Sequence, residues 1–95
     1  MNLPTEIKVG GVIYNIVLKP YIEIESDRNY QGMCDYMNTE ISILSDLSKE
    51  RMKDVFIHEL THAIFYEAGF DDQDEDMINR VGKVLYQVVS DNEFK

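Results

Sequence analysis

The residues most able to do chemistry are His58, Glu59 and His62, which form a His-Glu-x-x-His motif and include both histidines of the chain. On a helix, residues four apart lie one turn above each other, so both imidazoles face the same side and can bind one metal ion. Glu59 then stands where its carboxylate can take a proton from a metal-bound water. The motif predicts a hydrolytic site with Zn²⁺ as the cofactor.

A hydrolytic zinc site usually has three protein ligands and a water, so a third ligand is needed. Ala68 occupies the position where an extended motif would place another histidine, which excludes the long-motif metzincin class. We favour Glu75, because it lies three residues before Ile78, at the inward end of the apolar stripe of the last predicted helix. Asp74 is the second choice. Cys34 is the third, since a lone cysteine in a strand is more often a small buried hydrophobe.

Two simpler interpretations compete with this metal site. The histidines could be surface residues with an incidental glutamate between them, because so short a motif also occurs by chance. Glu75 could be an acidic residue of a first helical turn, where the helix dipole favours negative charge. A peptidase also needs a donor for the oxyanion. Four tyrosines could fill that role, and the sequence does not choose among them. For most of the four, packing in the core is the better explanation. They are Tyr14, Tyr36, Tyr66 and Tyr86.

The motif falls within a predicted helix over residues 49–68, with Ser48 as its N-cap and Gly69 as its left-handed stop. Apolar residues recur along this segment at helical spacing and mark the face that packs on a sheet. They are Met52, Val55, Phe56, Leu60, Ala63 and Ile64. The histidines flank this stripe, which predicts a partly buried cleft.

A second helix is predicted over residues 73–89, after a connection rich in acidic residues. Asn79, Arg80 and Lys83 are expected to face water. The apolar stripe predicted to face the core comprises Ile78, Val81, Leu85, Val88 and Val89.

The first half of the chain reads as strands. Residues 7–9 and 12–18 form a predicted hairpin with a Gly-Gly turn, and residues 33–37 and 40–44 form a second one. Residues 21–26 alternate between apolar and polar, which predicts a third strand or an extended edge. We expect an α+β fold with a minimal zincin-like core. Its small, twisted, mainly antiparallel sheet of about 3–5 strands should pack on the active-site helix and the C-terminal helix.

Length and composition bound the remaining possibilities. The 95 residues are expected to form a single domain over 1–95. A net charge of -9 repels nucleic acid and leaves a basic protein as a conceivable substrate or partner. A single cysteine fits a reducing cytoplasm, and no export signal or apolar run of membrane-spanning length is evident.

The chain resembles the small gluzincin-like metallopeptidases of phages and mobile elements, akin to the ImmA/IrrE family. The resemblance covers roughly residues 30–92 and includes the strand at 40–44, the motif with the following Ala63 and Ile64, and the acidic-then-apolar segment 74–81. It implies a following helix that supplies an acidic ligand, and a strand at 40–44 that forms the cleft edge and pairs with an extended peptide.

Members of that family cleave repressors or regulators, which implies a regulatory protein as substrate and, for a phage protein, the host cytoplasm as its location. Many members carry a DNA-binding segment that this chain lacks, which argues against a transcription-factor role; the net charge of -9 is the reason that no nucleic-acid partner is expected.

These observations predict a zinc metallopeptidase. The alternative is a zinc-containing, non-catalytic acidic module that sequesters or inhibits a host protein. A di-iron carboxylate site fails, because it needs two Glu-x-x-His units and Val55 stands where the second glutamate would be.

Overall fold

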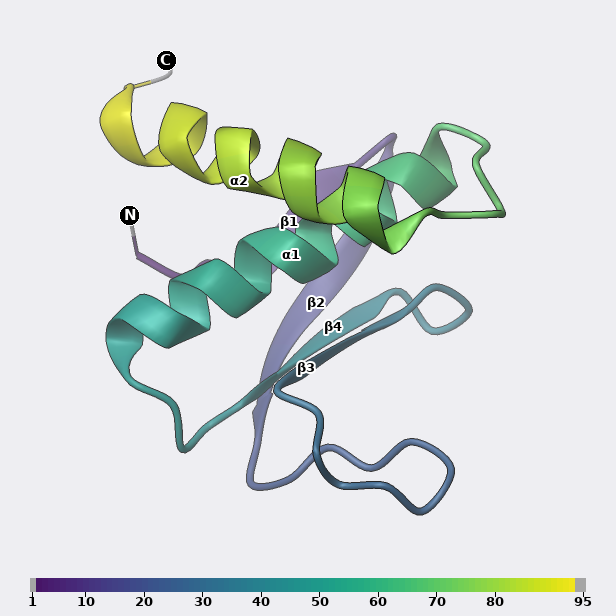
Figure 1. Ribbon diagram of the computed structural model, residues 1–95, viewed down its shortest axis with the longest axis vertical. Helices are drawn as coiled ribbons and strands as arrows, with labels where there is room; N and C mark the ends of the chain where they lie inside the picture. The colour runs from purple at the N-terminus through teal and green to yellow at the C-terminus, as the bar shows by residue number, and fades with distance from the viewer. Residues whose placement is uncertain (1, 94–95) are drawn as a thin grey trace.

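The computed structural model describes residues 2–93 as an α+β fold with one sheet and two helices (Figure 1). The strands come first along the chain and the helices follow. The elements are β1 (Glu6–Val9), β2 (Val12–Lys19), β3 (Gly32–Asp35), β4 (Glu40–Leu44), α1 (Lys49–Glu67) and α2 (Glu75–Asp91).

The sheet is mixed, with strand order β1-β2-β4-β3. Both predicted hairpins are confirmed, because β1 pairs with β2 and β3 with β4 in antiparallel fashion. The hairpins are joined through β2 and β4, which run parallel. Gly10 and Gly11 have positive φ angles of 57° and 86°, as the tight turn between β1 and β2 requires.

The prediction of a strand or extended edge at residues 21–26 is wrong, because that segment forms only an isolated bridge between Ile24 and Asp27. Glu25 and Ser26 have positive φ angles, so the chain reverses between the bridged residues instead of extending. Ile22 is buried nonetheless, and it lines a depression with Met33 of β3. Its apolar character therefore serves a local contact of the loop.

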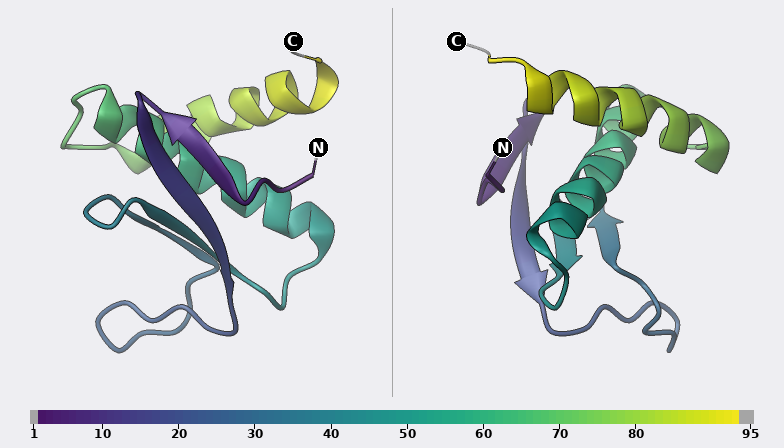
Figure 2. Two further views of the ribbon diagram at one scale, coloured as in Figure 1. Left: turned by 180° about the vertical axis from the view of Figure 1, so that it is seen from behind. Right: turned by 60° about the vertical axis from the view of Figure 1, so that its left-hand side comes forward.

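Helix α1 covers one face of the sheet, and α2 crosses α1 (Figure 2). Of the elements in residues 2–93, only α1 packs against α2. The expectation that both helices pack on the sheet is therefore corrected: α2 forms an outer layer over α1. The cluster of buried residues between α1 and the strands consists of Val9, Tyr14, Ile41, Ile43, Val55, Phe56, Ile57, Leu60 and Ala63.

Helix α1 follows the predicted pattern closely. Ser48 is the N-cap, and its side chain accepts a hydrogen bond from the backbone N–H of Arg51. The helix ends at Glu67, and Gly69 follows with a φ of 100°. Most of the predicted apolar stripe is buried, although Ile64 remains 37% exposed.

Helix α2 is rotated relative to the prediction. Ile78 is buried as expected, but Val81 and Val88 are 43% and 36% exposed. Gly82 is buried instead, and a Cβ atom there would lie 3.1 Å from the Thr61 hydroxyl oxygen of α1. The absence of a side chain at Gly82 lets the two helices approach closely, and this contact fixes which face of α2 points inward.

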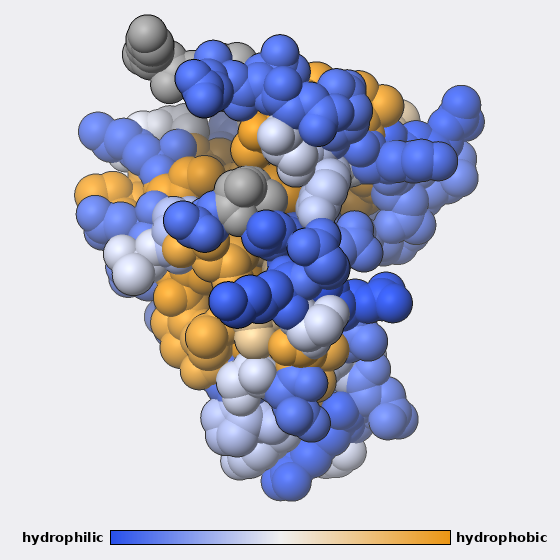
Figure 3. Space-filling view, turned by 90° about the vertical axis from the view of Figure 1, so that its left-hand side faces the viewer, coloured by the Kyte–Doolittle hydropathy of each residue, from blue (hydrophilic) through white to orange (hydrophobic). Residues whose placement is uncertain are grey.

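The surface is uneven in polarity. Seen from the side where α1 begins and α2 ends, hydrophobic side chains gather in the middle and hydrophilic ones surround them (Figure 3). Met52, near the start of α1, is only partly buried. Within residues 2–93, neither helix has both the length and the apolar composition needed to cross a membrane.

Candidate metal centre

His58, His62 and Glu75 converge at the point where the two helices meet. Each offers a ligand atom, and these atoms lie within 4.8 Å of one another. The His62 Nε2 atom is 3.1 Å from one carboxylate oxygen of Glu75, and the His58 Nε2 atom is 3.8 Å from the other. The structure therefore brings together the two motif histidines and the acidic residue favoured as the third ligand.

The packing of α2 against α1 explains how Glu75 comes close to His58 and His62 although it lies far from them in the sequence. His58 and His62 lie four residues apart on α1, and their rings approach edge to face with centroids 4.9 Å apart. Glu75 is the first residue of α2, and the close packing at Gly82 brings that end of α2 over α1. The His62 side chain is 14% exposed, whereas that of Glu75 is 66% exposed. The site thus has a buried wall and an open mouth.

The donor set fits zinc. Two imidazole nitrogens and a carboxylate oxygen are common ligands of catalytic zinc, and ligands 2.0–2.1 Å from a tetrahedral ion lie about 3.3 Å apart. The two nitrogen–oxygen separations between these side chains, 3.1 Å and 3.8 Å, bracket that value. Burial lowers the pKa of His58, and the neighbouring His62 lowers it further, so the neutral form that binds metal is favoured.

Glu59 lies beside this cluster without joining it. Burial raises the pKa of its carboxyl to about 7, and the charge of Glu75 adds to the effect, whereas His62 opposes it. Gly32, at the start of β3, packs on the same carboxylate: a Cβ atom at Gly32 would lie 3.1 Å from Glu59 Oε2. Glu59 is thus held against the strand next to His58, His62 and Glu75, which lie close enough to hold a metal ion and are called the metal-binding group below.

A change of stability with pH follows from this environment. In the metal-free protein, folded Glu59 keeps its proton up to about pH 7, whereas the unfolded chain releases it near the ordinary value of 4.5. Between these values the folded state binds more protons, so the free energy of unfolding should fall as pH rises and then level off, losing about 1–3 kcal/mol. Urea denaturation with chelator at pH 5 and pH 8 measures the loss. Glu59→Gln should lack this component, and an unchanged pH dependence in that variant would refute the assignment.

The other ligand candidates have different roles. Asp74 is the N-cap of α2, and its side chain accepts a hydrogen bond from the backbone N–H of Asp76. Cys34 lines the same cavity as the cluster but does not belong to it. Burial raises the pKa of the Cys34 thiol to about 12, which disfavours the thiolate that binds metal.

The structure distinguishes the four tyrosines considered as donors to an oxyanion, because only some of them line the cavities at this site. Tyr14 is fully buried and donates a hydrogen bond to Glu67, while Tyr66 stacks on Tyr36 with ring centroids 4.2 Å apart. Tyr36 lines the cavity at the metal-binding group, and Tyr86 lines the cavity next to it. Tyr30, which the sequence analysis did not single out, lines both cavities.

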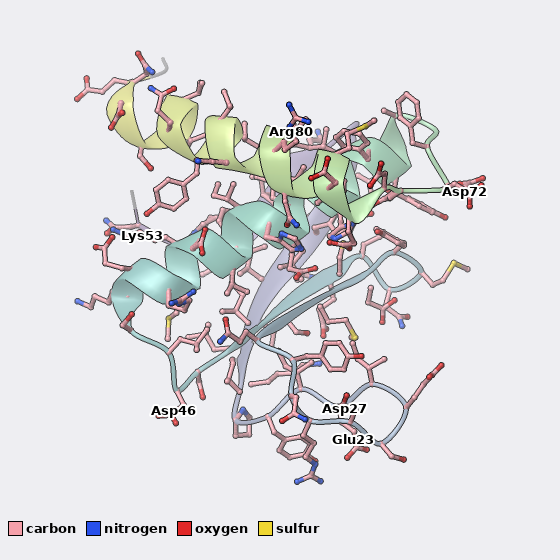
Figure 4. All side chains as sticks on the ribbon, in the orientation of Figure 1. Glu23, Asp27, Asp46, Lys53, Asp72 and Arg80 are labelled. Atoms are coloured by element: carbon pink, nitrogen blue, oxygen red, sulfur yellow. The ribbon has the colours of Figure 1, made fainter. Side chains whose placement is uncertain are left out.

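Two cavities form one groove along α1. One, of about 450 Å³, contains His58, Glu59, His62 and Glu75, and the other, of about 630 Å³, shares His58 and Glu59 with it. Asn79 and Lys83, predicted to face water, line the second cavity, so they lie along the groove. Arg80 points away from the sheet (Figure 4).

The edge of this groove is β3, not β4. Strand β4 lies between β2 and β3, so both of its edges are occupied. The resemblance implied that residues 40–44 form the cleft edge, and the strand order corrects this. Within the described chain, β3 pairs on one side only, and Gly32, Met33 and Cys34 line the cavity with the metal-binding group. The open edge therefore faces the site.

Sequence analysis missed Gln73, which binds His62. The Gln73 Oε1 atom lies within hydrogen-bond distance of His62 Nδ1, and its Nε2 atom donates to the main-chain oxygens of His62 and Phe70, at 3.3 Å each. The predicted helix began at Gln73, but α2 begins at Glu75, which leaves Gln73 in the connection. No motif marks this residue, because its partners come from the path of the loop.

Comparison of the chain with family models, with curated proteins and with solved structures finds no match.

Proposed function

We propose that this chain is a zinc-dependent peptidase. The observation that carries the proposal is the convergence of His58, His62 and Glu75 within 4.8 Å, with the partly buried carboxyl of Glu59 beside them. A helical His-Glu-x-x-His motif could arise by chance, so the proposal is supported mainly by a third ligand atom from another helix at a suitable separation.

The residues divide the chemical work. His58, His62 and Glu75 would hold Zn²⁺, which when bound lowers the pKa of its water toward about 7 and polarises a carbonyl. Glu59 would accept the proton of that water and deliver it to the leaving amine. A carboxyl whose pKa stands near 7 before metal binding is suited to both steps, and the nearby positive charge of the ion would favour its ionised form.

The groove supports a peptide as substrate. An extended chain lying along α1 could pair its main chain with the open edge of β3, as in strand addition to a sheet. Its scissile bond would then pass over His58 and Glu59, which line both cavities. Tyr30 and Tyr36 line the cavity with the metal-binding group and are therefore the hydroxyl candidates for the oxyanion.

Cleavage of a mixed peptide library tests the proposal. The zinc-loaded protein should produce new peptide ends detectable by mass spectrometry, a chelator should stop their formation, and added zinc should restore it. Zinc-loaded protein that yields no cleavage products at any pH between 6 and 9 would contradict peptidase activity.

The second candidate is a non-catalytic acidic module that binds a host protein. It is favoured by the net charge of -9 and by apolar side chains left exposed along α2, namely Met77, Val81, Val84 and Val88. Such exposed apolar stripes often mark interaction surfaces. A stoichiometric complex with an intact partner, insensitive to Glu59→Gln and disrupted by Val84→Asp, would favour this function over hydrolysis.

A further inference from the structure

The side-chain amide of Gln73 has a single orientation compatible with its neighbours. Two of its contacts are the main-chain oxygens of His62 and Phe70, each 3.3 Å away. Carbonyl oxygens only accept hydrogen bonds, so the NH₂ group of the amide must face them. The amide oxygen therefore points the other way, toward Tyr36 and the His62 ring.

This orientation decides which ring nitrogen of His62 carries the proton. An amide oxygen only accepts, so the His62 Nδ1 atom beside it must be protonated to form the hydrogen bond. The Tyr36 hydroxyl, 3.4 Å from the same oxygen, can donate as well. In the neutral ring, a proton on Nδ1 leaves the lone pair on Nε2, the atom that faces Glu75.

We propose that Gln73 is a positioning residue that holds His62 in its Nδ1–H tautomer and turns the Nε2 lone pair toward the metal-binding group. The consequence for metal affinity rests on the proposed function, whereas the tautomer does not. The His62 Nε2 atom and a carboxylate oxygen of Glu75, 3.1 Å apart, are then two acceptors side by side. A metal ion between them would relieve their repulsion, so the amide prepares this pair to receive a cation.

Gln73 also ties three parts of the chain together. It contacts the ring and main chain of His62 on α1, the Phe70 carbonyl in the α1–α2 connection, and Tyr36 just after β3. A purely structural residue would make the same contacts, so the test must separate holding the connection from holding the ring.

Two substitutions make this separation. Gln73→Leu removes both the amide donor and the amide acceptor. Gln73→Glu keeps an acceptor for His62 Nδ1 but loses the NH₂ group that serves the two carbonyl oxygens. Both variants should lose stability in urea denaturation, because both leave those carbonyls without this donor. Only Gln73→Leu should release the ring. Gln87→Leu, which removes an exposed glutamine of α2, is the matched control.

The tautomer is read without metal from long-range ¹H–¹⁵N NMR spectra at pH 8. The chain has two histidines, so a His58→Gln background leaves the signals of His62 alone. We expect the Nδ1-protonated form with the native Gln73 and with Gln73→Glu, and a shift to mixed or Nε2-protonated ring with Gln73→Leu. An Nε2-protonated ring in the presence of Gln73, or no change in Gln73→Leu, would overturn the proposal.

Zinc affinity, measured by competition with a chromophoric chelator with His58 intact, tests the consequence. Gln73→Leu should bind zinc about 10–100-fold more weakly, as is usual when a partner of a metal-bound histidine is lost. Gln73→Glu should stay within a few fold of the native chain, and an equal loss in both variants would assign Gln73 a structural role only. If the native protein takes up no zinc but shows the Nδ1–H tautomer, the proposed peptidase fails and the assignment of Gln73 stands.

Discussion

Replacing Glu59 by glutamine is expected to lower peptide cleavage by about a thousandfold, within the range of 10²–10⁴ that general acid–base catalysis contributes. Glutamine has the same shape as glutamate, so it preserves the close contact with Gly32 but cannot accept the proton of a water. Zinc affinity should change by no more than a few fold, since Glu59 does not belong to the metal-binding group. Cleavage rates at equal zinc occupancy measure the effect.

Glu50→Gln is the matched control, because Glu50 is a glutamate in the first turn of the same helix. It should leave cleavage unchanged. If the zinc-loaded Glu59→Gln protein cleaves as fast as the native protein, Glu59 is not the base and the mechanism is wrong.

Removal of a metal ligand should have the second large effect. Loss of a residue that only hydrogen-bonds to a metal-bound histidine costs about 10–100-fold in metal affinity. Loss of a ligand itself should cost more, so His62→Ala and Glu75→Ala should each weaken zinc binding by about 100-fold or more. The Glu75 side chain is 66% exposed, so its replacement should leave the fold intact. Calorimetric titration with zinc, alongside circular dichroism of each metal-free variant, measures both quantities.

Asp74 and Cys34 supply the controls for this series. Asp74→Ala should cost about 1 kcal/mol of stability through loss of the N-cap of α2, while zinc affinity remains near that of the native chain. Cys34→Ser should bind zinc as the native protein does, since Cys34 lies outside the ligand group. Normal zinc binding by Glu75→Ala together with loss in Asp74→Ala would transfer the third-ligand role to Asp74.

The sequence predicted those parts of the molecule that depend on local rules. Both hairpins follow from paired β-rich segments, which flank a Gly-Gly turn in the first and Asn38-Thr39 in the second. Helix α1 follows from the Ser48 cap, its apolar stripe and Gly69. The alignment of His58 with His62 then follows from helix geometry alone. Glu75 was chosen from its place relative to Ile78, and it does lie near both histidines because Ile78 faces the core.

The features that sequence analysis missed depend on contacts between distant segments. Helical spacing predicted that Val81 and Val88 belong to the buried stripe of α2. In the structure Gly82 packs closely against Thr61, so a different face of α2 points inward and both valines are exposed. Periodicity identifies apolar positions and cannot say which of two apolar sides a neighbour will cover. Gln73 was missed for a related reason, since its bonds to His62 exist only once the connection folds back over α1.

The order of the strands in the sheet also could not be predicted from local sequence patterns. Both hairpins could be recognised, but their parallel junction through β2 and β4 depends on how they assemble on α1. That junction decides that β3 is the open edge beside Glu59. The site therefore combines residues predictable from a motif with an edge that only the assembled sheet defines.

Titration of the metal-free native protein with zinc, purified without an affinity tag, tests the central claim most directly. The geometry of His58, His62 and Glu75 predicts one zinc per chain with an affinity tighter than micromolar, and the Glu75→Ala variant should lose this binding. A native protein that takes up no zinc at micromolar concentration would contradict the assignment of this group as a metal centre.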